Sequence, residues 1–376
     1  MKICYLASAG SLHFKRWYEF FINRGHKVYL ISGDTSLVKY KVDIPGLEIF
    51  YLPEKKLKNK ILSFSLNVAI LPFILLKLKM ILRKIKPDIL HSHQIHPYCF
   101  WAALSGFRPF IATPMGSDIL VNARKYRLYK RIAKYVFDKA SIVTASSLVL
   151  KEVALEIGLD IDKFRLIQNG VDLELFKAKK NGTEANIRND YDISENAPII
   201  FYGRGMVPLY NVDKIVASIP AVLEKYPDCK FMFAHHFGEV DSKLVNMIEK
   251  LKLQNSVIFL GFIKQESMPA FMRVSDIFVS VPSSDNSPSS VYEAMACGLP
   301  TVINRLPWTG YAMEHLKNTY IIERADPVLI SDAIIKLLQD KELCNRIRDG
   351  AFQTVRKHFS YRENMKKMEK LMTGTI

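Results

Sequence analysis

The sequence predicts an α/β protein built from two doubly wound domains, each with a parallel sheet covered by helices. The chain has 376 residues, more than one compact core usually holds. Short apolar runs alternate with amphipathic segments, a rhythm that indicates parallel strands buried on both faces. A polar stretch over residues 177–196 interrupts this rhythm, which then starts again.

Strands are expected at the short apolar runs, and helices at the amphipathic segments between them. The chain opens with such a run at residues 2–8, followed by a helix over residues 12–24 that Gly25 ends. Further strands are expected at residues 27–32, 88–91, 110–113, 141–145, 198–202, 230–234, 256–260, 276–281 and 301–304. Later helices are expected at residues 327–338 and 342–358. Ligands of such folds bind beyond the carboxyl ends of the strands, so the site is expected there.

The composition is that of an ordinary folded protein, with 49% hydrophobic and 24% charged residues. The five cysteines include no Cys-x-x-Cys pair, which argues against a disulfide framework or a structural zinc site. The N-terminal residues lack the basic region and the long apolar region of a signal peptide. We therefore expect a cytoplasmic protein in a reducing compartment.

The net charge of +16 is placed unevenly. Residues 1–170 hold 27 Lys or Arg against 12 Asp or Glu, whereas residues 171–376 hold 26 against 25. The first half is therefore expected to face an anionic partner, with nucleic acid, anionic lipid and an acidic acceptor as candidates. No recognised nucleic-acid-binding module is apparent, so nucleic acid is not expected.

Residues 55–86 combine an apolar centre with lysines and arginines at both ends. Pro72, Lys77 and Lys79 lie inside the apolar part, which makes it a poor transmembrane span. Two interpretations stay open: a buried pair of helices with basic ends, or a peripheral contact with the inner face of a membrane.

A long polar loop follows the strand expected at residues 276–281. Residues 283–300 read SSDNSPSSVYEAMACGLP, with Asp285 and Glu293 eight positions apart. A strand, a small polar loop and a helix N-terminus direct several backbone amides at an anion, typically a phosphate. Acids on both sides of that anion could accept hydrogen bonds from hydroxyl groups, an arrangement that suits a nucleotide sugar.

The same residues also have a purely structural interpretation. Ser287 could cap the helix, with Pro288 as its first residue. Ser290 and Glu293 have the spacing of a capping box. On this interpretation Glu293 stabilises the helix and touches no ligand.

Asp285-x7-Glu293 with the run EAMACGLP resembles the hallmark of the retaining glycosyltransferases of family 4, the group 1 glycosyltransferases, which have the GT-B fold. Further matching landmarks are PDILHSH (87–93), MGSDIL (115–120), LIQNGVDLELF (166–176), YGRG (202–205) and HFSY (358–361). The resemblance covers essentially the whole chain and implies two Rossmann-like doubly wound domains facing a cleft.

The expected organisation follows from this resemblance and from the polar stretch. It comprises a basic, acceptor-binding domain at residues 1–176, a linker at 177–197, a nucleotide-sugar-binding domain at 198–358, and a C-terminal helix at 359–376 that crosses back to the first domain.

The resemblance implies a retaining, metal-independent enzyme of the hexosyltransferase type. It would use no cofactor, and a UDP-sugar is the favoured donor. Asp285 would bind hydroxyls of the donor sugar, Arg204 would clamp the diphosphate, and Glu293 would hold the ribose. The remaining implied contacts are backbone amides of Ser287, Ser289 and Ser290 on sugar and phosphate, Gly10 beside the phosphates, His93 near sugar and acceptor, and Ile263 near the base.

The sequence departs from the family in two places. Tyr210 and Asn211 stand roughly where the family has a Lys-Gly pair whose lysine also holds the diphosphate. Lys214 and Arg305 are candidate replacements for that lysine. The first carboxylate is Asp285 rather than the more usual glutamate, which shortens its reach.

The leading hypothesis is a glycosyltransferase that acts on a lipid-linked acceptor or a precursor of a surface glycan, in polysaccharide or glycolipid biosynthesis. The alternatives are a nucleotide-sugar epimerase of the same fold, which would need an acid/base set, and a donor-binding protein without turnover. No metal site is expected, because His91, His93 and His96 lack nearby cysteines or paired carboxylates.

Overall fold

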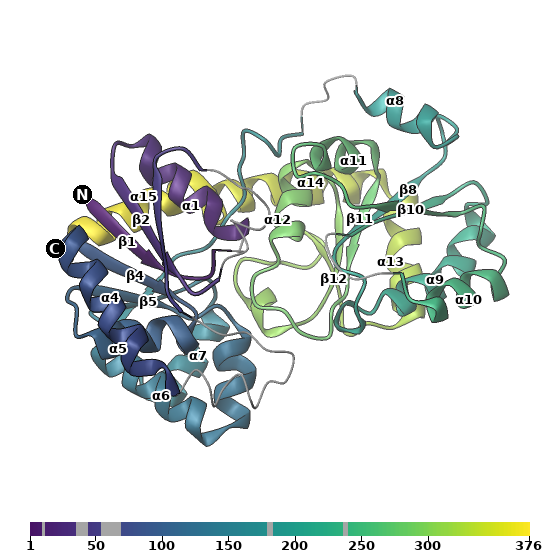
Figure 1. Ribbon diagram of the computed structural model, residues 1–376. Helices are drawn as coiled ribbons and strands as arrows, with labels where there is room; N and C mark the ends of the chain where they lie inside the picture. The colour runs from purple at the N-terminus through teal and green to yellow at the C-terminus, as the bar shows by residue number, and fades with distance from the viewer. Residues whose placement is uncertain (10–11, 35–43, 54–68, 179–182, 236–239) are drawn as a thin grey trace. The chain divides into compact units, whose positions relative to one another are not determined.

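The computed structural model describes residues 1–9, 12–34, 44–53, 69–178, 183–235 and 240–376. The chain forms two compact units, the first made of residues 1–167 and 365–376 and the second of residues 168–364 (Figure 1). Each contains one parallel sheet with helices on it, so the predicted α/β class with two doubly wound units is confirmed.

The first unit holds a seven-stranded sheet in the order β3-β2-β1-β4-β5-β6-β7. Its strands are β1 Lys2–Leu6, β2 Lys27–Ser32, β3 Leu47–Tyr51, β4 Ile89–His93, β5 Phe110–Thr113, β6 Ile142–Ala145 and β7 Phe164–Leu166. The helices are α1 Leu12–Asn23, α4 Leu71–Ile85, α5 Phe100–Ser105, α6 Arg127–Lys139 and α7 Leu148–Ile157, with shorter turns at Ile95–Cys99, Asp118–Ala123 and Ile161–Lys163. The five strands expected in this half are confirmed, whereas β3 and β7 were not anticipated.

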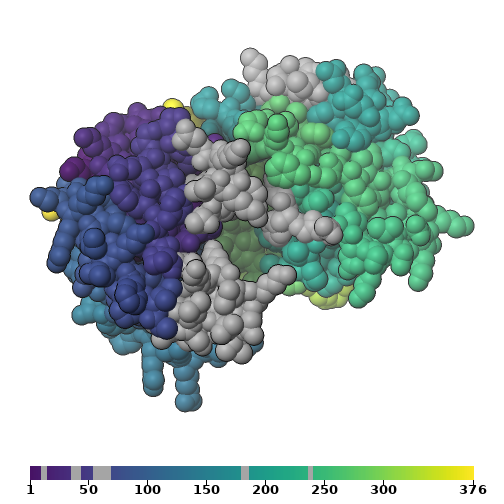
Figure 2. All heavy atoms as spheres, viewed as in Figure 1, coloured from purple at the N-terminus to yellow at the C-terminus, as the bar shows by residue number. Residues whose placement is uncertain are grey.

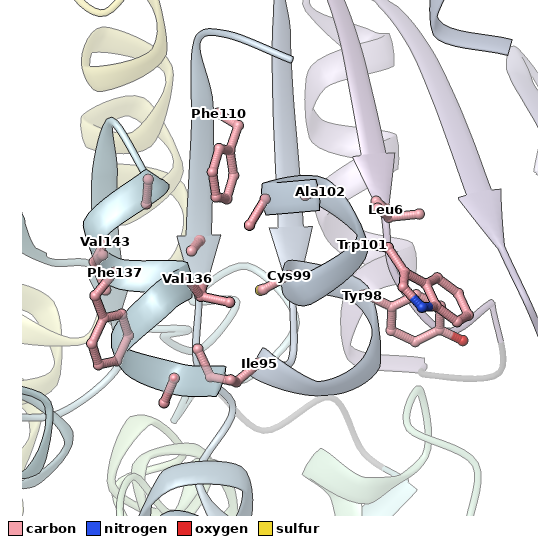
Figure 3. Packing of buried hydrophobic residues seen from close by; sticks show 14 of the residues in the cluster. Leu6, Ile95, Tyr98, Cys99, Trp101, Ala102, Phe110, Val136, Phe137 and Val143 are labelled. Carbon is pink, nitrogen blue, oxygen red and sulfur yellow. The ribbon is translucent and has the colours of Figure 1, made fainter. Parts of the chain in front are cut away.

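The core of this unit fills the space between the sheet and its helices. In Figure 3, Phe110 on β5 and Val143 on β6 lie opposite Ala102 on α5 and Phe137 on α6. All four are fully or almost fully buried. Central strands such as β1 and β5 are buried along almost their whole length because both faces of the sheet are covered.

The GSD landmark has a structural role within this unit. Asp118 is 5% exposed. Its carboxylate accepts hydrogen bonds from the backbone amides of Ile95 at 2.9 Å, Gly116 at 2.8 Å and Ile119 at 3.1 Å. One buried carboxylate thereby joins the loops that follow β4 and β5 and satisfies amides that would otherwise be orphaned.

The second unit holds a six-stranded sheet in the order β10-β9-β8-β11-β12-β13. Its strands are β8 Ile199–Gly203, β9 Lys230–Ala234, β10 Val257–Gly261, β11 Ile277–Ser280, β12 Thr301–Asn304 and β13 Tyr320–Ile322. The helices are α8 Thr183–Asp190, α9 Val212–Lys225, α10 Ser242–Lys250, α11 Met268–Val274, α12 Ser289–Ala296, α13 Pro327–Gln339, α14 Lys341–His358 and α15 Tyr361–Thr373, the last of which continues into the first unit. The strands expected in this half are confirmed, and β13 is additional.

The stretch expected to be a linker contains part of the second unit. Helix α8 lies within it and contacts α11. Ile187 and Ile193 are buried there, at 8% and 6% exposure. The Arg188 guanidinium donates to the carbonyls of Ser194 and Ala197 at 2.8 and 3.0 Å. A few buried apolar residues therefore hold this segment on the second unit, although its overall composition is polar.

Two landmarks far apart in the sequence meet in the second unit. Val171, within the NGVD run, forms a bridge with Ser360 of the HFSY run. The Val171 amide donates to the Phe359 carbonyl at 2.7 Å, and the Tyr361 amide donates to the Val171 carbonyl at 2.9 Å. Gly170 takes a φ of +69° at this crossing, where a Cβ atom would lie 2.7 Å from the Phe359 carbonyl oxygen. The glycine is needed because the two backbones approach too closely for any side chain.

Candidate functional site

The candidate site lies at the carboxyl ends of β8 and β11, the two central strands of the second unit. Strand order runs outward in opposite directions from this pair, from β8 to β10 on one side and from β11 to β13 on the other. Such a reversal is the topological switch point at which doubly wound sheets bind their ligands. Arg204 directly follows β8, and Asp285 lies in the loop after β11.

Arg204 and Asp285 form a buried ion pair at this point. Arg204 Nη2 lies 2.7 Å from Asp285 Oδ2, and the two side chains are 11% and 10% exposed. Arg204 Nη1 also donates to Ser280 Oγ at 3.0 Å. Burial disfavours the charged guanidinium, but the Asp285 carboxylate and the nearby Tyr210 outweigh it and raise the pKa of Arg204 above its ordinary value. The site therefore presents a permanently charged, aligned guanidinium.

The loop before α12 is held by its own side chains. Asp285 Oδ1 accepts hydrogen bonds from the amides of Asn286 at 2.7 Å and Ser287 at 3.3 Å. Ser287 Oγ donates to Gln168 Oε1 at 3.0 Å. Asp285 thus fixes the turn through one oxygen while it pairs with Arg204 through the other.

The capping interpretation of this loop is wrong. Helix α12 begins at Ser289, Pro288 occupies the N-cap position, and no side chain makes a capping hydrogen bond. Pro288 has an extended ψ of 95°, so it cannot be the first helical residue. The amides of the first turn therefore have no side-chain cap, which is the condition for binding an anion at a helix N-terminus. The Ser290 hydroxyl is buried and has no hydrogen-bond partner within the described part of the chain.

Comparison with known proteins decides the family. The model for glycosyl transferases group 1 matches residues 183–354, and the model for glycosyl transferase 4-like proteins matches residues 2–147. The chain belongs to the group 1 glycosyltransferases.

Individual relatives agree with this assignment. The N-acetyl-alpha-D-glucosaminyl L-malate synthase of Bacillus anthracis is 23% identical over 350 residues, which cover 89% of this chain and 86% of the relative. The crystal structure of Anabaena HepE in complex with UDP superposes with a TM-score of 0.81 at 18% identity, covering 100% of both chains. The structure of the same protein with UDP-glucose superposes with a TM-score of 0.78 at 18% identity, again over 100% of both. These likenesses show the GT-B fold.

Further residues of this glycosyltransferase pack against α12 and the loop before it. Tyr292 on α12 stacks on Phe359, with ring centroids 3.9 Å apart and planes at 13°. Gln168, which precedes the NGVD run, is 4% exposed and reaches Ser287. Neither Gln168 nor Ser280 can be identified from local sequence motifs, because each lies far along the chain from the residue that it contacts.

The other candidate residues of this unit lie at the same edge of the sheet. Ile263 follows β10 and is 6% exposed. Ser289 opens α12, and Glu293 lies about one turn further along it, partly buried. The structure therefore places Ile263, Arg204 and Asp285 after the carboxyl ends of three parallel strands. Their contacts with a ligand stay predictions.

The first unit supplies the remaining candidates. His93 ends β4 and is 1% exposed, with its ring centroid 4.2 Å from His91 and 5.2 Å from Trp17. Burial lowers the pKa of His93 to about 3, so its imidazole is neutral at neutral pH. Gly10 lies outside the described residues, as do Lys55, Lys56, Lys58 and Lys60, the lysines that open the basic and apolar segment at residues 55–86. Within the described ranges no group of three or more His, Cys, Asp or Glu side chains could hold a metal ion.

Arg305, a candidate replacement for the family's lysine, is engaged elsewhere. Its guanidinium pairs with Glu323, with Nε–Oε2 and Nη2–Oε1 distances of 2.8 Å. Lys214 lies in the first turns of α9 and is partly exposed. Arg204 is the cation that the described structure pairs with Asp285 at the switch point.

Proposed function

We propose that this glycosyltransferase moves a sugar, with retention at the anomeric carbon, from a nucleotide-diphosphate sugar to an acceptor. The observation that carries the proposal is the buried Arg204–Asp285 pair at the β8/β11 switch point, beside an uncapped helix N-terminus. We take a UDP-sugar as the donor, since Anabaena HepE binds UDP and UDP-glucose.

The proposed chemistry needs charge stabilisation rather than a metal. The transition state builds negative charge on the leaving diphosphate and positive charge on the sugar ring. Arg204 and the first-turn amides of α12 would stabilise the former. Asp285 would accept hydrogen bonds from sugar hydroxyls, and neutral His93 would orient the sugar or leaving group without adding charge. The acceptor then attacks from the face that the diphosphate leaves, and the leaving phosphate takes its proton.

We propose that the acceptor is lipid-linked or a precursor of a surface glycan. One relative in support is a phosphatidylinositol N-acetylglucosaminyltransferase component from Arabidopsis thaliana. It is 25% identical over 290 residues, which cover 75% of this chain and 61% of the relative. We place the enzyme in the cytoplasm because its five cysteines are free.

A thermal-shift screen of nucleotide sugars tests the donor. A ligand at a hundred times its dissociation constant stabilises the native state by about 2.7 kcal/mol. For a unit of this size that corresponds to a rise in Tm of roughly 5–10 °C. We expect this rise with one or a few UDP-sugars. A panel of UDP-, GDP- and ADP-sugars that leaves Tm unchanged would contradict the proposal.

Product analysis then separates the three functions. Transfer to an added acceptor supports the glycosyltransferase. Conversion of the donor into another nucleotide sugar without an acceptor indicates an epimerase, and binding without either product indicates a donor-binding protein.

We further propose that the first unit attaches to an anionic membrane surface through α4. The apolar side chains of Phe73, Leu76 and Met80 are 67%, 60% and 60% exposed and recur at helical spacing. Lysines and arginines lie between and after them, and the helix has no acidic residue. The blue atoms of this part of the first unit lie on the visible face of the protein (Figure 2). Exposed apolar residues ringed by cations suit a layer of anionic headgroups over acyl chains. No helix among the described residues is long and apolar enough to cross a membrane.

Replacing Phe73, Leu76 and Met80 together with serine should lower binding to vesicles of phosphatidylcholine and phosphatidylglycerol by about tenfold or more. Each side chain would lose apolar burial of about 1 kcal/mol. Sedimentation measures the bound fraction. The matched control replaces two exposed apolar residues of the second unit with serine: Val328, which is 65% exposed, and Phe352, which is 44% exposed. Equal binding by both variants and the unaltered protein would exclude α4 as the contact.

A further inference from the structure

Tyr210, which the family resemblance places roughly where the family has its lysine, lies against Arg204. The ring of Tyr210 lies against the guanidinium, with Arg204 Cζ 4.3 Å from its centroid. We propose that Tyr210 is a positioning residue that holds Arg204 ready for the donor diphosphate. The proposal rests on the donor site proposed above. In this enzyme one pre-aligned cation would do the work that an arginine and a lysine share in the family's usual pattern.

Arg204 is held by three groups of different kinds. Ser280 Oγ accepts from Nη1 at 3.0 Å, Asp285 Oδ2 lies 2.7 Å from Nη2, and Cζ lies over the ring of Tyr210. A free arginine side chain loses considerable rotamer freedom when it binds a phosphate. Here that freedom is already restricted, and the aromatic face stabilises a cation most strongly where water is excluded.

Tyr210 is itself fixed by the residues around it. It ends a short 3-10 turn at Pro208–Tyr210, and Asn211 follows with a left-handed φ of 52°. Asn211 Nδ2 donates to the Val281 carbonyl at 2.8 Å, and Ser283 Oγ donates to Asn211 Oδ1 at 3.2 Å. The Ser283 amide also donates to the Leu209 carbonyl at 2.8 Å.

These bonds tie the loop after β8 to the loop after β11. The ring and the Asp285 carboxylate are therefore set relative to one another by direct contacts between their loops. A glycine would allow the left-handed turn at position 211, but it would lack the side-chain amide of asparagine, which forms two of these hydrogen bonds. On this proposal, the Tyr-Asn pair supplies a fixed geometry where the family's usual pattern has a second charge.

The role predicts an effect on diphosphate binding that depends on Arg204. Isothermal titration with UDP should show Tyr210→Leu binding about three- to thirtyfold more weakly than the unaltered protein. Tyr210→Phe keeps the ring and should bind within about twofold. In the Arg204→Ala background, Tyr210→Leu should cause no further loss, because the ring would have no guanidinium to hold.

Several outcomes would overturn the inference. If Tyr210→Leu binds UDP as the unaltered protein does, the ring does not position Arg204. If Tyr210→Leu weakens binding equally with and without Arg204, Tyr210 acts on the ligand or on the fold instead. Melting temperatures of all variants, with exposed Phe352→Leu as the aromatic control, reveal any general destabilisation. An unaltered protein that binds neither UDP nor any UDP-sugar would contradict the proposed donor, a failure distinct from that of Tyr210.

Discussion

Arg204→Ala should reduce kcat/KM for sugar transfer by about 10³-fold, in the range found when one preorganised charge-stabilising donor is removed. The guanidinium is the cation that the described structure pairs with Asp285 at the switch point, so its removal takes away the charge aligned there. The variant should also melt at a lower temperature, because Asp285 would keep a buried charge without its partner. Steady-state rates with the identified donor and a thermal melt measure the two effects.

Two companion variants separate charge, geometry and stability. Arg204→Lys keeps the charge, but a single ammonium group cannot contact Ser280 and Asp285 as the two guanidinium nitrogens do. Its activity should therefore lie between that of Arg204→Ala and that of the unaltered protein. Arg305→Ala removes an exposed guanidinium, 54% accessible, from a surface pair with Glu323. Surface pairs contribute about 0–1 kcal/mol, so its activity and Tm should stay near those of the unaltered protein. Full activity in Arg204→Ala, or a comparable loss in Arg305→Ala, would refute the assignment.

The regular elements of this protein could be predicted because they are strongly patterned. Buried parallel strands such as KVYLIS and KFMFA are apolar runs with clear boundaries, and both form as expected. Strands β7 and β13 were missed because each has only three residues. The linker was misjudged because Ile187 and Ile193, the residues that anchor it, are isolated in a polar segment.

The candidate site could be predicted only in part. Asp285 and Arg204 were identified from local motifs, and the fold brings them together at the switch point. The partners of Ser287 and Arg204 follow from tertiary structure alone, since Gln168 lies 119 positions from Ser287 and Ser280 lies 76 from Arg204. The predicted capping box is wrong for a local reason. Helix α12 begins at Ser289 with Pro288 at its N-cap position, so Ser290 already lies inside the helix and cannot cap it.

Gly170→Ala should destabilise the second unit far more than Gly261→Ala, although both glycines have nearly the same backbone conformation. Their φ angles are +69° and +66°, so each substitution incurs a left-handed strain of about 1–2 kcal/mol. A Cβ at Gly261 meets nothing within 4 Å, whereas one at Gly170 lies 2.7 Å from the Phe359 carbonyl oxygen and 2.7 Å from the Tyr361 amide. These are backbone atoms, so the crossing of the two segments must open.

Opening that crossing weakens the support of the donor loop as well as the fold. The two hydrogen bonds of Val171 would lengthen, and the stacked Phe359–Tyr292 pair beneath α12 would shift. We expect a loss of roughly 4 kcal/mol for Gly170→Ala, which lowers Tm by about 10 °C in a unit of this size, with weaker UDP binding besides. Both glycines lie in the second unit, so the same melting transition reports both variants. Equal Tm losses would mean that the NGVD glycine is required only for its φ angle; a larger loss at Gly170 identifies the close approach of the two chains as the reason for it.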